Sequence, residues 1–308
     1  MYKIEQVPFG EFTKIKLINS VSGEFVSIVP EFGANVNEIT LVSGGGVFSL
    51  LDSDKTYKEL VKNEWYKGAK MVPFPNRVEN GRYEFERKKY ELPINYEHHA
   101  IHGIVYNKNF SVIEKKALSK EAFVLLEYKY NGDLGGYPFP FTIQIRYSLS
   151  KNGFRADTII INTGKLTAPI GDGWHPYFSF GEKVDELSIK LPSNKKIEVK
   201  ELIPTGKYST IKDFVSLQKI KATNFNLGLV MRKRKKVITT IFSPKNNFSL
   251  NVWQSASYPY LQVFTPPGRA SIAIEPMSCN ANAFNNKKGL VSLAPKKSFK
   301  GSYGVYLS

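Results

Sequence analysis

Apolar and polar side chains alternate strictly over residues 141–149, near the middle of the chain. A repeat of two is the period of a β-strand that buries one face. A turn signal, Lys151-Asn152-Gly153, follows this stretch and leads into a second apolar run at 154–161. The pattern predicts an antiparallel hairpin with a half-buried face. The apolar positions of its first strand are Phe141, Ile143, Ile145, Tyr147 and Leu149.

Short apolar runs bounded by turn residues recur along most of the chain, and they are rich in Ile, Val, Thr, Tyr and Phe. Such residues favour pleated sheets, and the one plausible helix, a short one, lies within 54–67. Because there is no low-complexity linker, repeat or shift in composition, we predict a single all-β domain over residues 1–308. Further strands are predicted at 14–18, 25–29, 82–85, 187–191, 237–242, 248–253, 261–265, 271–275 and 304–307.

The formal net charge of +16 raises the question of an acidic partner. Most of the excess is lysine scattered along predicted strands and turns. One dense basic cluster, at 232–236, separates apolar runs at 227–231 and 237–242, and it lacks the interleaved aromatic residues that stack on nucleic-acid bases. We interpret it as a solvated hairpin turn and expect no nucleic-acid or membrane partner. A basic nucleic-acid or membrane-surface module is kept as an alternative.

The single cysteine, Cys279, excludes an intramolecular disulfide framework. The first residues lack the apolar run of a signal peptide, and no apolar stretch approaches the roughly 20 residues that span a bilayer. These observations lead us to expect a soluble cytoplasmic protein.

Two ionisable residues stand out because each directly precedes a proline. His175 is flanked by aromatic residues and followed by Pro176, which disfavours helical backbone at the histidine. Glu275 precedes Pro276 at the end of an alternating strand. We expect the two side chains to meet across a cleft as a general acid and base. Isolated Glu and His titrate near about 4.3 and about 6.5, so Glu275 is expected to be an ionised base at neutral pH that favours protonated His175.

The other histidines raise the question of a metal site. His98, His99 and His102 lie close together in the sequence, but neither a Cys pair nor a helical His-Glu-x-x-His motif accompanies them. A Gly-x-Ser-x-Gly nucleophile elbow is also absent. We therefore expect neither a metal nor a cofactor, and we interpret His98 and His99 as surface or loop residues.

A series of short motifs runs in order along nearly the whole chain. The first is Asn76-Arg77 after a proline-rich approach, where two prolines predict an irregular segment without regular ladder pairing. The others are Ile101-His102-Gly103, His175-Pro176-Tyr177-Phe178, Leu261-Gln262-Val263-Phe264-Thr265, and Ile274-Glu275-Pro276 followed by Asn282-Ala283-Phe284-Asn285. Each motif alone is weak, but five in this order are specific. Together they resemble the aldose 1-epimerase (galactose mutarotase) family.

The resemblance implies a large antiparallel β-sandwich with a sugar cleft on one face, and cofactor-free interconversion of the α and β anomers of an aldose. Glu275 matches the family's general base, which removes the proton of the C1 hydroxyl. His175 matches the acid that protonates the ring oxygen. The positions that hold sugar hydroxyls or the ring oxygen match Asn76, Arg77, His102 and Gln262. Trp174, Tyr177 and Trp253 are expected either to offer apolar faces to the sugar or to pack in the core.

The chain departs from the family pattern at 223–225, where the family usually carries a sugar-binding aspartate ahead of a phenylalanine. The equivalent here is Asn224. An amide forms hydrogen bonds but brings no charge, so neither galactose nor glucose is assumed to be the substrate. The loop after Gly103 also lacks the Gly-Phe-Asp of galactose-specific members, which places the chain nearer the shorter, less characterised branch.

Three functions are therefore kept open: an aldose mutarotase acting on an unidentified free sugar, a hexose 6-phosphate epimerase, and a non-catalytic carbohydrate-binding β-sandwich. The presence of both Glu275 and His175 favours an enzyme, because binding alone needs neither a base nor an acid. For Arg77, an ion pair with Glu79 is the alternative to sugar binding. The sequence identifies neither the sugar nor the oligomeric state.

Overall fold

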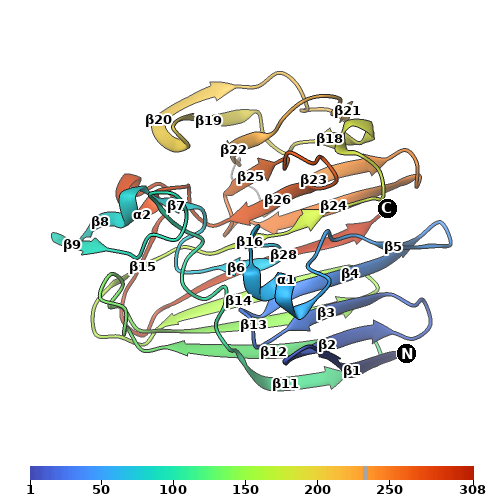
Figure 1. The fold of residues 1–308 in the computed structure, drawn as a ribbon, viewed down its shortest axis with the longest axis horizontal. Coiled ribbons are helices and arrows are strands. Elements are labelled where there is room, and N and C mark those ends of the chain that lie inside the picture. Colours follow the sequence, from blue (N-terminus) through green and yellow to red (C-terminus); the bar gives the residue numbers. More distant parts are fainter. Residues whose placement is uncertain (232–234) are drawn as a thin grey trace.

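The computed structural model describes residues 1–231 and 235–308, and its regular structure is almost entirely antiparallel β-strand (Figure 1). The large antiparallel β-sandwich expected from the sequence is confirmed. Three sheets of nine, eight and five strands form its body, and three two-stranded ribbons lie beside them. In the described part of the chain, no helix is both long enough and apolar enough to span a bilayer.

The nine-stranded sheet has the order β11-β12-β13-β14-β28-β24-β23-β18-β21. Its strands are β11 (Ser111–Ala117), β12 (Glu121–Tyr130), β13 (Phe141–Ser150), β14 (Gly153–Asn162), β18 (Ser188–Lys190), β21 (Gln218–Lys219), β23 (Lys236–Ser243), β24 (Phe248–Ser255) and β28 (Ser298–Leu307).

The eight-stranded sheet has the order β20-β19-β22-β25-β26-β16-β6, and β17 pairs with β26 beside this path. Its strands are β6 (Ala69–Met71), β16 (Gly173–His175), β17 (Tyr177–Phe178), β19 (Lys195–Lys200), β20 (Ile203–Thr210), β22 (Asn226–Val230), β25 (Tyr260–Phe264) and β26 (Ile272–Met277). The five-stranded sheet runs in chain order through β1 (Tyr2–Phe9), β2 (Phe12–Asn19), β3 (Phe25–Val29), β4 (Asn35–Ser43) and β5 (Gly46–Ser49).

Short elements complete the fold. The ribbons pair β7 (Arg77–Val78) with β10 (Ala100–Ile101), β8 (Arg82–Phe85) with β9 (Lys88–Glu91), and β15 (Ala168–Ile170) with β27 (Val291–Leu293). The helices are α1 (Tyr57–Lys62) and α2 (Ala283–Asn286), with single 3-10 turns η1 (Glu79–Gly81) and η2 (Val184–Glu186). The predicted helix within 54–67 is α1, and Thr56 and Glu59 form a capping box at its start.

One continuous core joins the three sheets. Trp174 of the eight-stranded sheet stacks on Tyr303 of the nine-stranded sheet, with ring centroids 5.1 Å apart. Phe48 of the five-stranded sheet packs on Phe248 of the nine-stranded sheet at 4.6 Å. The eight- and five-stranded sheets therefore both pack against the nine-stranded sheet.

The predicted hairpin at 141–161 forms as β13 and β14. The five alternating apolar side chains of β13 are fully buried. Gly153 turns the chain with φ +83°, a backbone conformation that favours glycine. The strand predicted at 25–29 coincides with β3.

Two local predictions are wrong. The strands that flank the basic cluster do not form a hairpin: β22 belongs to the eight-stranded sheet and β23 to the nine-stranded sheet. Residues 232–234 of the cluster lie outside the described residues. Arg77, expected on an irregular segment, opens the short strand β7, where it is the register partner of Ile101.

Candidate active site

His175 and Glu275 lie on neighbouring strands. Both β16 and β17 pair with β26, with Pro176 between them, and the registered pairs Gly173–Met277 and Tyr177–Ala273 place His175 opposite Glu275. His175 Nε2 is 3.5 Å from Glu275 Oε1. The two residues are only 6% and 2% exposed. The structure thus brings this pair together at a buried position.

Burial controls the protonation of this pair. It raises the pKa of Glu275 to about 8, although the positive charge of Arg77 acts in the opposite direction. It also lowers the pKa of His175 to about 4. Our expectation of an ionised Glu275 and a protonated His175 at neutral pH is therefore wrong for the site without a ligand. Between these two values the pair carries one proton, and that proton resides on Glu275.

The β7–β10 ribbon brings the two central motifs together. His102 N–H donates to the Asn76 carbonyl at 2.9 Å, and both residues adopt left-handed backbone, with φ near +60°. The His102 ring contacts that of His175 edge-on, with centroids 4.8 Å apart. Arg77 Nη1 donates to Asn76 Oδ1 at 3.2 Å. No carboxylate of the described chain forms an ion pair with Arg77, so the expected alternative, a pair with Glu79, does not occur there.

These side chains line one cavity of about 370 Å³. Seven of the predicted site residues lie there: Asn76, Arg77, His102, His175, Tyr177, Gln262 and Glu275. Eight lining residues were not predicted to be site residues, although Ile101 and Phe264 lie within the quoted motifs: Glu64, Trp65, Tyr66, Tyr96, Ile101, Leu202, Asn226 and Phe264. Five of the fifteen are Trp, Tyr or Phe, so the cavity combines aromatic walls with polar side chains, a combination that suits a sugar.

Two predicted site residues lie outside the cavity. Asn224 is exposed, and its side-chain oxygen accepts a hydrogen bond from Arg269. Asn226, two positions later on β22, lines the cavity and accepts from Gln262 Nε2 at 2.9 Å. Trp253 lies on β24 of the nine-stranded sheet, beneath the ammonium of Lys236 at 4.4 Å from the ring centroid. Both assignments to sugar binding are therefore corrected.

The remaining residues singled out from the sequence differ in how deeply they are buried. Trp174 is fully buried in the core, so core packing is its role, whereas Tyr177 faces the cavity. His98 is exposed, while His99 is buried and accepts a hydrogen bond from Asn80 N–H at 3.2 Å. Among residues 1–231 and 235–308, no three His, Cys, Asp or Glu side chains are arranged to hold a metal ion.

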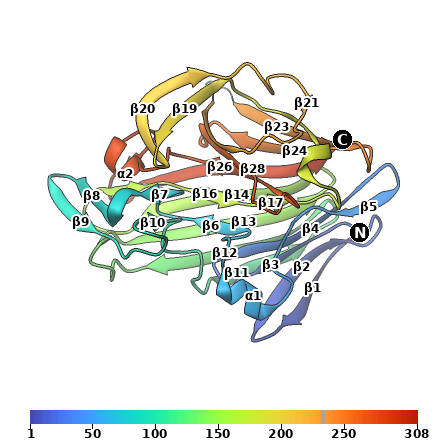
Figure 2. The same ribbon diagram turned by 45° about the horizontal axis from the view of Figure 1, so that its top comes forward.

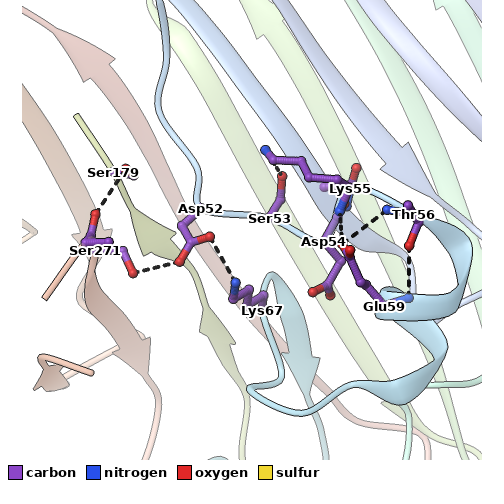
Figure 3. A network of polar contacts seen from close by, with 11 residues as sticks. Asp52, Ser53, Asp54, Lys55, Thr56, Glu59, Lys67, Ser179 and Ser271 are labelled. Atoms are coloured by element: carbon purple, nitrogen blue, oxygen red, sulfur yellow. Dashed lines mark hydrogen bonds and ion pairs between the residues drawn. The ribbon is translucent and has the colours of Figure 1, made fainter. Parts of the chain in front are cut away.

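A polar network around Asp52 involves Lys67, which directly follows Trp65 and Tyr66 in the same loop, and these two aromatic residues line the cavity. Asp52 accepts from Lys67 Nζ at 2.9 Å and from Ser271 Oγ at 2.8 Å, which connects this loop to the start of β26 (Figure 3). The Trp65 ring stacks on Phe264 with centroids 6.4 Å apart. The loop is thus held against the strands that form the cavity floor.

A buried ion pair lies behind the catalytic candidates. Lys70 on β6 and Asp172 are both fully buried, with Nζ 2.7 Å from Oδ1. Lys70 also donates to Thr158 Oγ1, and Tyr258 donates to Asp172 Oδ2. Asp172 and Ser278 exchange two hydrogen bonds of 2.8 Å. We call these five residues the Lys70 network; it joins the chain three residues before His175 to the chain three residues after Glu275.

Fold and site together define a class: an antiparallel β-sandwich with a carboxyl and imidazole pair buried in an aromatic-walled cavity. Comparison with known proteins then gives the family. The family model described as aldose 1-epimerase matches residues 14–306, so the chain belongs to the aldose 1-epimerase family.

The chain is also similar to individual known proteins. The protein YihR of Escherichia coli K12 is 28% identical over 314 residues, which cover 98% of this chain and 97% of YihR. The bifunctional protein GAL10 of Kluyveromyces lactis is 25% identical over 285 residues, covering 83% of this chain and 40% of GAL10.

Solved structures show the same fold. A galactose mutarotase-like protein of Clostridium acetobutylicum superposes with a TM-score of 0.86 at 21% identity, covering 100% of this chain and 98% of the other. Galactose 1-epimerase of Lactobacillus acidophilus NCFM gives a TM-score of 0.82 at 16% identity, with the same coverage of both chains.

Proposed function

We propose that the protein is a mutarotase that interconverts the α and β anomers of a free aldose. One observation carries the proposal: four buried polar atoms, without a hydrogen-bond partner in the described chain, belong to residues of a single cavity. They are Glu275 Oε2, His175 Nδ1, His102 Nδ1 and Arg77 Nε. An unpaired buried polar group costs about 1–3 kcal/mol. A ligand rich in both donors and acceptors, such as a sugar, relieves that cost.

The pair supplies the acid and base that ring opening requires. In the proposed mechanism, Glu275 removes the proton from the C1 hydroxyl while the bond between C1 and the ring oxygen breaks. His175 gives its proton to the ring oxygen, and the open aldehyde forms. Rotation about the C1–C2 bond presents the other face of the aldehyde. Reclosure then reverses the two proton transfers and gives the other anomer, so that no proton is gained or lost.

The pair carries one proton throughout this cycle. In the site without a ligand, burial favours this proton on Glu275. Protonated Glu275 with neutral His175 is also the state that ring opening produces and from which ring closure starts. A cyclic sugar requires the proton to move first from Glu275 to His175, 3.5 Å away. The positive charge of Arg77 stabilises ionised Glu275, and hydrogen bonds from sugar hydroxyls would add to that effect.

The charge of the cavity favours a free sugar over a sugar phosphate. Arg77 is its only lysine or arginine among the described lining residues, and that guanidinium interacts with the Glu275 charge. A phosphate dianion beside Glu64 and Glu275 would find a single cation. We therefore favour the mutarotase over the hexose 6-phosphate epimerase.

The test is to mix pure α-anomers of hexoses, pentoses and their 6-phosphates with the protein and to follow anomeric equilibration by polarimetry or exchange NMR. Glu275→Gln and His175→Asn should each lower the catalysed rate by about 10²- to 10⁴-fold. Trp253→Phe, outside the cavity, is the control and should retain the rate. If the unaltered protein accelerates none of the sugars above buffer, the mutarotase proposal fails and the carbohydrate-binding module replaces it.

A further inference from the structure

A second hollow lies beside the cavity and takes no part in the mechanism above. It has a volume of about 380 Å³. One side comes from the 3-10 turn η1 and the loop before β10, and the other from the turn end of the β19–β20 hairpin, which both views place next to β7 (Figures 1 and 2). Its principal polar residues are Glu79, Asn80, His98, His99, Lys200 and Glu201.

The cavity and the hollow share their walls. Tyr96 lines the cavity, and His98, two residues later, lines the hollow. On the hairpin, Leu202 lines the cavity, whereas its neighbours Glu201 and Ile203 line the hollow. Three separate chain segments, 76–80, 96–99 and 200–205, thus contribute to both, which places the two spaces side by side.

The burial of the cavity residues fixes the direction in which a sugar enters. Glu275 is 2% exposed and lies at the bottom, while Tyr96 and Leu202 are 42% and 36% exposed and lie at the rim. Proton transfer requires C1 of the sugar to be at the bottom. The opposite end of a pyranose, with C4 and C6, therefore faces the rim, to which Trp65 at 40% exposure also contributes. A group attached there that extends past Tyr96 and Leu202 reaches the hollow.

The hollow has the chemistry of a sugar subsite. Two carboxylates accept hydrogen bonds, the Lys200 ammonium and Asn80 amide donate them, and the exposed Tyr96 ring at the boundary offers an apolar face. Burial lowers the pKa of His99, which favours its neutral form. Glu79 and Glu201 outnumber the single ammonium, so a neutral polyhydroxylated group fits this surface better than a phosphate.

We propose that the hollow is a second sugar subsite and that the preferred substrate is a reducing oligosaccharide. Its reducing-end ring occupies the cavity above Glu275, and the next ring, linked through C4 or C6, occupies the hollow. This inference rests on the proposed mutarotase function, because that function determines which end of the sugar lies at the bottom of the cavity.

The experiment compares glucose with the reducing disaccharides maltose and isomaltose, in which a second glucose is attached to C4 or C6. Exchange NMR measures kcat and KM for the anomerisation of each sugar. The expected result is a KM about tenfold lower for at least one disaccharide than for glucose. Lys200→Ala and His98→Ala should remove most of that difference. Lys207→Ala, an exposed β20 residue outside the hollow, is the matched control and should preserve it.

Calorimetric titration of the same sugars separates failure of this inference from failure of the mutarotase, because affinity requires no turnover. If glucose is anomerised but the disaccharides show no advantage in KM or affinity, the subsite is refuted and the mutarotase stands. If no sugar is anomerised, a tenfold tighter binding of a disaccharide that Lys200→Ala abolishes still supports the subsite. Equal affinities for glucose and both disaccharides overturn it.

Discussion

Replacing Glu275 with glutamine should stabilise the protein without a ligand, and the gain should grow with pH. The carboxyl is buried and its pKa is raised from 4.5 to about 8. In the unfolded chain it ionises at its ordinary pKa, whereas in the folded protein it must stay protonated or pay for a buried charge. Stability from this group is therefore complete below about pH 4.5 and is lost as the pH rises toward 8.

The size of the effect follows from the two pKa values. Each pH unit between them corresponds to about 1.4 kcal/mol of unfolding free energy. The carboxyl thus costs about 3 kcal/mol at pH 7 and about 5 kcal/mol at pH 9, and nearly nothing at pH 4.5. Glutamine is nearly isosteric and does not titrate, so Glu275→Gln should recover most of that cost. At pH 9 we expect a rise in Tm of roughly 10 °C.

The assay is urea unfolding of the unaltered protein and Glu275→Gln from pH 6.5 to 9. His175 has the opposite dependence: its lowered pKa means that stability is present above about 6.5 and is lost as the pH falls toward 4. The chosen window therefore isolates Glu275. Glu86→Gln, at an exposed residue in the turn between β8 and β9, is the matched control. A difference between unaltered protein and Glu275→Gln that stays constant with pH would refute the reasoning.

Two further predictions follow from the site. Lys70→Met should lower the unfolding free energy by about 3–5 kcal/mol, because it leaves Asp172 buried without its counter-ion. In urea unfolding, the double variant Lys70→Met/Asp172→Leu should recover most of that loss. A double variant that loses as much unfolding free energy as the sum of its two single variants would contradict this. Asn226→Ala should raise the KM for the sugar about tenfold by removing one hydrogen-bond partner, whereas Asn224→Ala should change it less than twofold; equal effects in the polarimetric assay would return Asn224 to the site.

Periodicity and turn chemistry predicted the sheets well where a strand has one buried face. The β13–β14 hairpin follows from strict alternation ending at Gly153, and β3 follows from an apolar run bounded by turns. The proximity of His175 and Glu275 was expected from two proline-bounded segments. The hairpin and β3 are local in sequence, which is why a single chain reveals them. His175 and Glu275 are a hundred residues apart, and the resemblance to a known family supported their pairing.

The rest of the site depends on contacts that the sequence does not encode locally. Tyr96 and Leu202 reach the cavity from a loop and from a hairpin turn, and neither lies in a motif. Asn224 and Asn226 are two positions apart, so the sequence does not show which of them faces the cavity; in the structure Asn224 lies before β22 and bonds to Arg269, whereas Asn226 opens β22 and lines the cavity. Likewise the pKa values of the acid and base pair depend on burial, which the fold supplies.

The Lys70 network gives a physical reason for the close approach of the acid and base. Along β16, Trp174 points into the core and His175 into the cavity, and Lys70 pairs in register with Trp174. The ion pair therefore lies on the core face, where desolvating two charges is costly. Because Asp172 is also bonded to the end of β26, the network holds both strands from behind. Burying the Glu275 carboxyl and the His175 imidazole side by side is costly, which opposes the close approach of the strands that carry them. The Lys70 network on the opposite face holds these strands together and counters that effect.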